Sequence, residues 1–227
     1  MTKPPAVPAP MLTPPRTLSP AVPSPALPPL VAALSRQADA GDAVAQYRLG
    51  VIYALGQDVP KDDRHAAALF RAAAESGIAE AQYNIGLLYA DGQGVPRDAS
   101  EAVRWYRRAA AQGNPNAAFN LGVAYGNGSG VAKSMTDAAQ WFHIAAGAGV
   151  VNAQFNLALL YEHGEGLQES PIEAFAWYAA AASRGDQIAA QRRNVLAAGM
   201  SPDQRKQAAS RAAELDRMIG TAGASKP

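Results

Sequence analysis

The chain has 227 residues, 20 of them basic and 19 acidic, and it contains no cysteine. The near-neutral charge gives no electrostatic reason to expect nucleic acid or an anionic membrane as the main partner. The lack of cysteine excludes disulfides, thiolate metal sites and a cysteine nucleophile. No run of about 18 apolar residues is present, so we expect no membrane insertion and a cytoplasmic location.

The first segment, residues 1–29, is rich in proline and carries only two charged side chains, Lys3 and Arg16. Such a composition cannot bury enough apolar surface to offset the entropy of ordering, so we predict a disordered tail. The segment also lacks the unbroken apolar core of a secretory signal. Its P-x-x-P spacings suit aromatic-lined receptors, but proline density alone produces them, and a plain tether is favoured.

From residue 41 onward the sequence repeats with a step of 36 residues. Glycine, alanine, tyrosine and tryptophan keep fixed positions in successive units. These residues are Gly41, Gly77, Gly113, Gly149 and Gly185; Ala45, Ala81, Ala117, Ala153 and Ala189; Tyr53, Tyr89, Tyr125 and Tyr161; and Trp105, Trp141 and Trp177. Such repetition indicates an array of stacked units. Residues 30–41 are in phase with the end of a unit and predict an N-terminal capping helix.

The second unit shows how each one is built. Its first part, AEAQYNIGLLYADG, carries an apolar stripe at helical spacing, formed by Ala81, Ile85 and Leu88. The turn GQGVPR follows. The segment DASEAVRWYRRAAAQG then predicts a second helix that begins at the N-cap Asp98 and ends at Gly113. Equivalent caps recur at Asp62, Ser134 and Ser170.

The glycine-rich turn raises the question of a phosphate-binding loop, because such loops often lead into helices. Here a phosphate would meet the carboxylate of Asp98, which already occupies the positive end of the helix dipole. The turn also varies, to GQDVPK in the first unit and GEGLQE in the fourth. We therefore interpret it as a structural turn and predict no nucleotide or other cofactor.

A glycine stands in the middle of the first helix in three of the units. Glycine costs about 1 kcal/mol against alanine at such a position, so its repetition predicts close approach of the paired helices. We expect small residues of the Ala109 type opposite the glycine, with Tyr89 and Trp105 as wedges between neighbouring hairpins. The positions are Gly50, Gly86 and Gly122, with Ala158 in the last unit.

The G-x-G-V turn, the Trp-Tyr pair and the A-A-x-x-G ending together resemble the Sel1-like repeat, a relative of the tetratricopeptide repeat. The resemblance implies an all-α, right-handed superhelical solenoid of helix hairpins and a role as a protein–protein adaptor. Three departures, Asp58, the pair Leu69-Phe70 and Ala158, leave the predicted fold intact. The resemblance covers four units, 42–77, 78–113, 114–149 and 150–185.

The pattern degrades after the fourth unit, where we predict C-terminal capping helices over residues 186–220 and a flexible tail over 221–227. A fresh helix start is marked by Ser201 and Pro202, with Gln204 as the third residue after the cap. Solenoids need such closing helices to cover the apolar face of the last repeat.

The residues beside the apolar stripe of each first helix form a candidate binding groove. In related tetratricopeptide folds the first helices line the concave surface, so the resemblance implies that this stripe faces the groove. The groove candidates are Arg48, Val51, Leu55, Asn84, Leu87, Asp91, Asn120, Asn127, Asn156 and His163, and their neighbours on the same stripes are Val44, Glu80, Asn116, Val123, Asn152 and Leu159.

Asn84, Asn120 and Asn156 form a ladder with one asparagine per repeat. A side-chain amide has both a donor and an acceptor, so each asparagine can bind the N–H and C=O groups of an extended peptide. The alternative is that each amide makes its hydrogen bonds within the fold.

Signals for catalysis are weak. The three histidines lack metal-ligand spacing, and neither S-x-x-K nor G-x-S-x-G occurs, so we predict no enzyme activity and no metal. We predict a monomeric scaffold that binds a protein or peptide segment on its concave face. Two alternatives stay open: an accessory or hydrolase-like factor in cell-envelope metabolism, suggested by β-lactam hydrolysis among cysteine-rich relatives, and a structural array that assembles through its ends.

Overall fold

The computed structural model describes residues 27–224, and within this range every regular element is an α-helix. The all-α fold predicted from the repeat is therefore confirmed. Most of the proline-rich tail and the last three residues of the chain lie outside the described range. The helices are α1 (Pro29–Asp39), α2 (Ala43–Leu55), α3 (Asp63–Glu75), α4 (Ala79–Asp91), α5 (Ala99–Ala111), α6 (Pro115–Asn127), α7 (Met135–Gly147), α8 (Val151–His163), α9 (Pro171–Ser183), α10 (Gln187–Gly199) and α11 (Pro202–Ala224).

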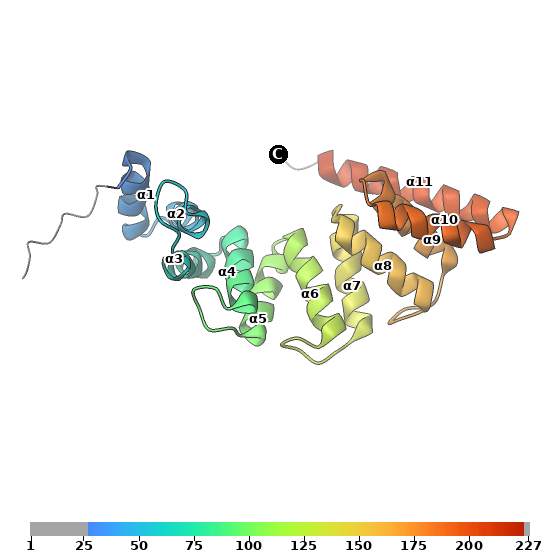
Figure 1. Ribbon diagram of the computed structural model, residues 1–227, viewed down its shortest axis with the longest axis horizontal. Helices are drawn as coiled ribbons and strands as arrows, with labels where there is room; N and C mark the ends of the chain where they lie inside the picture. Colours follow the sequence, from blue (N-terminus) through green and yellow to red (C-terminus); the bar gives the residue numbers. More distant parts are fainter. Residues whose placement is uncertain (1–26, 225–227) are drawn as a thin grey trace, which may run out of the picture.

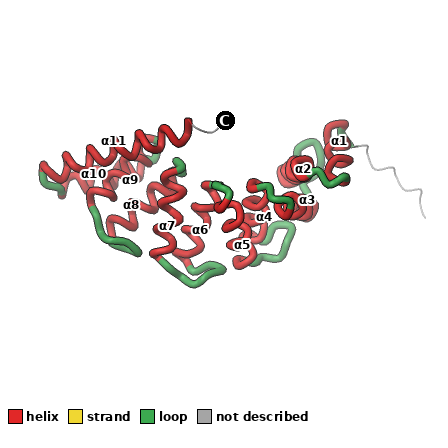
Figure 2. The backbone as a smooth tube through the Cα atoms, turned by 180° about the vertical axis from the view of Figure 1, so that it is seen from behind, coloured by secondary structure: helices red, strands yellow, loops and turns green. Residues whose placement is uncertain are grey.

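The helices form a curved solenoid of hairpins. The tightest pairs are α2 with α3, α4 with α5, α6 with α7 and α8 with α9, and each second helix also packs against the next first helix. The hairpins follow one another along an arc, with α1 at one end and α10 and α11 at the other (Figures 1 and 2). The long loops of the last three hairpins lie on the outer side of this arc (Figure 2).

Side-chain caps explain where the second helices begin. The carboxylate of Asp98 accepts hydrogen bonds from the backbone N–H groups of Ser100 and Glu101. The predicted caps of the other second helices accept in the same way, and these are Asp62, Ser134 and Ser170. The helix N-terminus that follows the G-x-G turn is thus satisfied by the protein itself, in agreement with a structural turn.

The second glycine of each turn packs against the preceding hairpin. Gly94 has a φ of 69°, and a Cβ atom there would lie 2.0 Å from the carbonyl oxygen of Asp63 at the start of α3. In the first unit Asp58 takes this position with a φ of 60°. The residue in phase with Asp63 is then Leu27, which precedes α1. The same close approach to α5 and α7 is made by Gly130 and Gly166.

The mid-helix glycines accommodate an aromatic ring of the paired helix. A Cβ atom at Gly86 would lie 2.6 Å from Cε1 of Tyr106, so this ring lies directly on the backbone of α4. The predicted close approach is confirmed, but the expectation of a small residue opposite, of the Ala109 type, is wrong. The glycine provides space for a large flat side chain. The equivalent pairs are Gly50 with Phe70 and Gly122 with Phe142.

Aromatic side chains fill the space between hairpins. Trp105 and Trp177 are each 2% exposed, whereas Trp141 is only half-buried between the cores of the second and third hairpins. Tyr89 packs against the apolar clusters on both sides of α4, as predicted for a wedge. The tryptophan position is thus interior in α5 and α9 and only partly covered in α7.

A row of glutamines, which our sequence analysis did not single out, joins successive hairpins. The amide of buried Gln82 donates to the carbonyl oxygen of Ala74 in the last turn of α3, and buried Gln154 donates to Ala146 in the last turn of α7. The final carbonyls of a helix lack intrahelical partners, so each bond satisfies one of them. Gln46 makes the same bond to the carbonyl oxygen of Ala38 in α1. Gln46 and Gln82 are one repeat step apart, and this spacing could have identified the row of glutamines from the sequence.

The C-terminal end departs from the hairpin pattern. Arg193 and Asn194 of α10 are in phase with Leu157 and Ala158, which are buried in α8. These polar side chains do not suit the close pairing of a hairpin. Instead of pairing with α10, α11 packs against α9 and reaches α7, with Ile219 buried near its end.

Candidate binding face

One side of the first helices is not used in the hairpin cores, and we call it the first-helix face. Each of its residues in α2 to α8 is exposed or half-buried, in contrast to the apolar stripe beside it. The face consists of Val44, Arg48, Val51 and Leu55 of α2; Glu80, Asn84, Leu87 and Asp91 of α4; Asn116, Asn120, Val123 and Asn127 of α6; and Asn152, Asn156, Leu159 and His163 of α8.

At the N-terminal end of the face, a pocket of about 380 Å³ opens between α1 and α2. Arg48 and Val51 line it, as do Leu30, Leu34 and Tyr47. Its walls are therefore apolar, with the guanidinium group of Arg48 as the one charged group among the lining residues. This pocket suits an apolar side chain.

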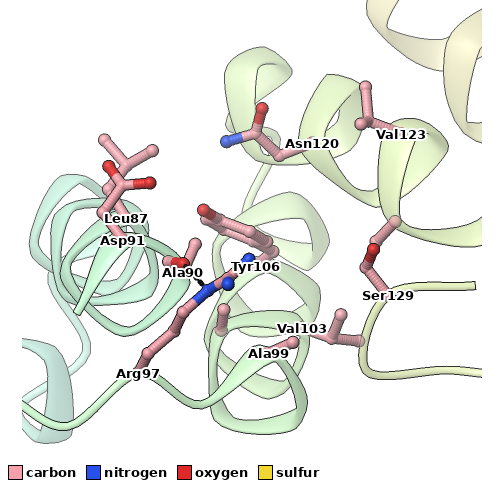
Figure 3. Close-up of a pocket in the computed structure, with 12 residues that line it drawn as sticks. Leu87, Ala90, Asp91, Arg97, Ala99, Val103, Tyr106, Asn120, Val123 and Ser129 are labelled. Carbon is pink, nitrogen blue, oxygen red and sulfur yellow. Dashed lines mark hydrogen bonds between the residues drawn. The ribbon is translucent and has the colours of Figure 1, made fainter. Parts of the chain in front are cut away.

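A second pocket of about 320 Å³ lies between α4 and α6, with α5 as its floor, and we call it the α4–α6 pocket (Figure 3). Leu87 and Asp91 line it from α4, and Asn120 and Val123 line it from α6. The ring of Tyr106 rises from α5 toward Asn120. Arg97, Ser129 and small side chains complete the lining.

The polar groups of the α4–α6 pocket influence one another. Burial raises the pKa of the Tyr106 hydroxyl above its ordinary value, and a hydrogen bond with Asn120 opposes this effect in part. The hydroxyl therefore stays protonated at neutral pH and can donate a hydrogen bond. Asn120 acts in the same way on Tyr83. The amide of Asn120 thus has interactions within the fold, as the alternative interpretation of the asparagine ladder expects.

A third pocket, of about 300 Å³, lies between α6, α8 and α10. Asn152 and Asn156 of α8 line it together with two aromatic side chains, Phe119 and Phe155, and with Ile188 of α10. The three pockets thus include six of the ten groove candidates, which are Arg48, Val51, Leu87, Asp91, Asn120 and Asn156.

The other four candidates lie outside these pockets. Asn84 is half-buried in the middle of α4, and the remaining three are exposed at the C-terminal ends of their helices. The structure therefore does not gather all the predicted groove residues into one site. The three at helix ends are Leu55, Asn127 and His163.

Two sets of residues on this face were missed by the sequence reasoning. The first is the fifth stripe, on α10, where Ile188 is 62% exposed and Val195 is 69% exposed, with Arg192 between them. The second is a row of half-buried aromatic residues beside the asparagines. The stripe on α10 could have been found by continuing the repeat step of 36 residues beyond the fourth unit. The same step relates the members of the aromatic row, which are Tyr47, Tyr83, Phe119 and Phe155.

The second helices form the opposite side of the solenoid, and two of its histidines contact aromatic rings. His65 stacks on Tyr53, with ring centroids 4.1 Å apart, and His143 meets the edge of Trp177 at 5.6 Å. Within residues 27–224 no three histidine, aspartate or glutamate side chains are placed to hold a metal ion. None of the helices in this range is both long and apolar enough to cross a membrane.

Comparison with known families matches the Sel1 repeat to four consecutive segments, residues 43–78, 79–114, 115–150 and 151–186. These segments begin one residue later than the units predicted from the glycine step. No curated protein matches the sequence.

Two solved structures are similar in both fold and sequence. A Sel1 repeat protein from Oxalobacter formigenes is 31% identical with a TM-score of 0.70, and the match covers 85% of this chain and 78% of that one. A protective antigen of uropathogenic Escherichia coli that displays an SLR fold is 28% identical with a TM-score of 0.56. That match covers 86% of this chain and 50% of the antigen.

Proposed function

The chain belongs to the Sel1 repeat family, and from this membership we propose that it is a non-enzymatic scaffold whose concave first-helix face binds a segment of a protein partner. Repeat folds of this kind build extended surfaces from many similar units, and such surfaces suit extended ligands.

The observation that carries the proposal is the continuity of the first-helix face. It runs through α2, α4, α6, α8 and α10, and pockets of about 300–380 Å³ open on it near both ends and at its centre. Side chains on this face are available to a partner without disturbing the hairpin cores, because none of them is fully buried in α2 to α8.

The composition of the face indicates what kind of segment it takes. Apolar and arginine side chains stand at both ends, on α2 and α10, and asparagine dominates between them. We expect apolar anchors near the ends of the bound segment and polar or backbone contacts in its middle. Few charges line the face, so affinity should depend only modestly on salt.

A pair of matched variants tests the proposal. Leu55→Asp combined with Val195→Asp places charges at both ends of the face, where the parent side chains are 62% and 69% exposed. Melting should stay unchanged, while affinity for the partner falls because each lost apolar contact is worth about 1.5–3 kcal/mol when fully buried. The matched control is Ile144→Asp, which changes a residue 54% exposed on the second-helix side.

The measurement is capture of a specific partner by the purified protein, followed by the Kd of each variant for that partner. The proposal requires the double variant to bind at least about tenfold more weakly and Ile144→Asp to bind like the parent. If only Ile144→Asp loses binding, the second-helix side is the interface. Turnover of a cell-wall substrate with no specific partner would favour the hydrolase-like alternative.

A further inference from the structure

The α4–α6 pocket has a counterpart elsewhere in the same chain. The ring that lies against each first helix is a tyrosine in only two hairpins, at Tyr106 in α5 and Tyr178 in α9, and it is Phe70 or Phe142 in the others. The two tyrosines are two repeat steps apart. The surroundings of their hydroxyl groups can therefore be compared position by position.

At Tyr178 the chain itself supplies a carboxylate. The Tyr178 hydroxyl donates to one carboxylate oxygen of Glu162 over 2.7 Å, and the other oxygen accepts from the guanidinium group of Arg192 at 3.3 Å. The Glu162 side chain is only 15% exposed. A phenol and a cation thus hold this carboxylate between α8, α9 and α10, and charge-assisted bonds of this kind are among the stronger hydrogen bonds in proteins.

At Tyr106 the corresponding carboxylate is missing from the sequence. Ala90 is in phase with Glu162, and Asn120 is in phase with Arg192. Both residues line the α4–α6 pocket. The short side chain of Ala90 leaves open the place that a glutamate side chain fills beside Tyr178. The side chains of Tyr106 and Asn120 lie toward one another across that space (Figure 3).

A cation is also present at this pocket, although it comes from a different element. Arg97 belongs to the loop before α5, and its Nε–H donates to the carbonyl oxygen of Ala90 at 3.0 Å. This bond holds the arginine against α4, and its side chain lines the pocket. Hydrogen-bond donors of three kinds, a phenol, an amide and a guanidinium group, therefore surround the open space.

We propose, on the basis of the proposed function, that the α4–α6 pocket binds the carboxylate of a glutamate side chain from the partner segment, in the place that Glu162 fills beside Tyr178. Tyr106 and Asn120 donate hydrogen bonds to it, and Arg97 supplies the positive charge. The methylene groups of the glutamate pack against Leu87 and Val123, which form the apolar walls of the pocket.

Asp91 is the group that opposes this ligand. It lines the same pocket from the last turn of α4 and would repel a second carboxylate. Asp91 is exposed, so solvent and salt screen its charge more than that of a buried group. Asp91→Asn removes this charge and should therefore tighten binding of the glutamate side chain. If the pocket instead binds a lysine or arginine side chain, the same variant should bind that side chain more weakly.

The test uses two capped pentapeptides, one with a central glutamate between alanines and one with glutamine in its place. Binding to the full chain is followed by the backbone amide NMR signals of Leu87 and Val123, which line the pocket and are present in every variant. We expect the glutamate peptide to bind about tenfold more tightly than the glutamine peptide, and Tyr106→Phe or Asn120→Ala to remove most of this preference. The matched control Asn194→Ala changes an exposed asparagine of α10 and should leave it intact.

Ala90→Glu provides the sharpest variant, because it rebuilds the arrangement around Tyr178. The new carboxylate should occupy the pocket and abolish binding of the glutamate peptide without lowering the melting temperature. Equal affinity for the two peptides, or unchanged binding to a folded Ala90→Glu variant, would overturn the proposal. If Ala90→Glu does not fold, Tyr106→Phe decides, since it removes only the hydroxyl group.

The outcome is separate from that of the proposed function. A partner that is lost in the Leu55→Asp, Val195→Asp variant but is retained by Asn120→Ala would support the scaffold and overturn the carboxylate pocket alone. Conversely, Asn120→Ala could lose the glutamate peptide while the Leu55→Asp, Val195→Asp variant still captures the partner. That result would support the carboxylate pocket and overturn the proposed binding along the whole face.

Discussion

At the scale of single residues, each hairpin depends on the contact between a first helix and an aromatic ring. In the fourth hairpin Ala158 takes the glycine position, and the ring planes of Phe155 and Tyr178 meet at 60°. In the second hairpin the planes of Tyr83 and Tyr106 meet at 39°. The alanine methyl group at this position thus goes together with a larger angle between the two rings, and we expect alanine in place of glycine to need an adjustment of these rings.

Two glycine-to-alanine variants separate this contact from helix propensity. Gly126→Ala adds a Cβ atom with its nearest neighbour at 3.8 Å and should stabilise the fold by about 0.5–1 kcal/mol. Gly86→Ala gains the same propensity but places its Cβ atom 2.6 Å from Tyr106, so its free energy of unfolding should fall below that of Gly126→Ala by about 1–3 kcal/mol. Urea denaturation measures both, and equal stabilisation would contradict the ring contact.

At the scale of helices, the same position in the repeat is not buried equally in every hairpin. Trp177 of α9 is 2% exposed and meets His143 of α7, whereas Trp141 of α7 keeps part of its surface in solvent. A substitution that looks equivalent in the repeat should therefore have different consequences in the two helices.

Trp177→Ala should cost about 3–5 kcal/mol of unfolding free energy, because it leaves a cavity in a closely packed core. Trp141→Ala should cost clearly less, since half-burial lowers the transfer and cavity contributions. Chemical denaturation gives the energies, and hydrogen exchange should show faster exchange in α8 and α10 beside the Trp177 site. A larger loss for Trp141→Ala would reverse the order of burial assigned to the two helices.

At the scale of the whole molecule, α11 closes the array. Leu215 and Ile219 are buried, and the guanidinium group of Arg211 binds the carboxylate of Glu173 on α9 at 2.8 Å. Arg193 and Asn194 of α10 occupy positions where a further hairpin would need apolar or small side chains. Both features disfavour extension of the array at this end, and we therefore expect a monomer.

Leu215→Asp should disturb this closure, because a charge at a side chain that is 1% exposed cannot remain against α9 without a partner. We expect the apolar surface of α9 to become accessible and the variant to associate, while the parent stays monomeric. The control Gln207→Asp introduces the same charge at an exposed position of α11. Light scattering coupled to gel filtration measures the masses; a parent that is already a multimer, or a Leu215→Asp monomer that melts like the parent, would refute the assignment.

The repeat, the helix hairpins and the caps at Asp98 and its counterparts could be predicted from the sequence, because helix ends and turns are set by hydrogen bonds between residues close in the chain. The sequence also predicted that the mid-helix glycines mark close approach of two helices. It could not show what these glycines approach, since the ring of Tyr106 comes from another helix.

The tertiary structure likewise decided which face residues meet in pockets. The α4–α6 pocket is formed by Ala90, Tyr106 and Asn120, which come from three helices. Its open space corresponds to the place that the Glu162 carboxylate fills beside Tyr178. The packing of α11 on α9 could not be predicted from the repeat, because the repeat ends before α10. Which residues of α11 are buried depends on the surface that the last hairpin leaves open.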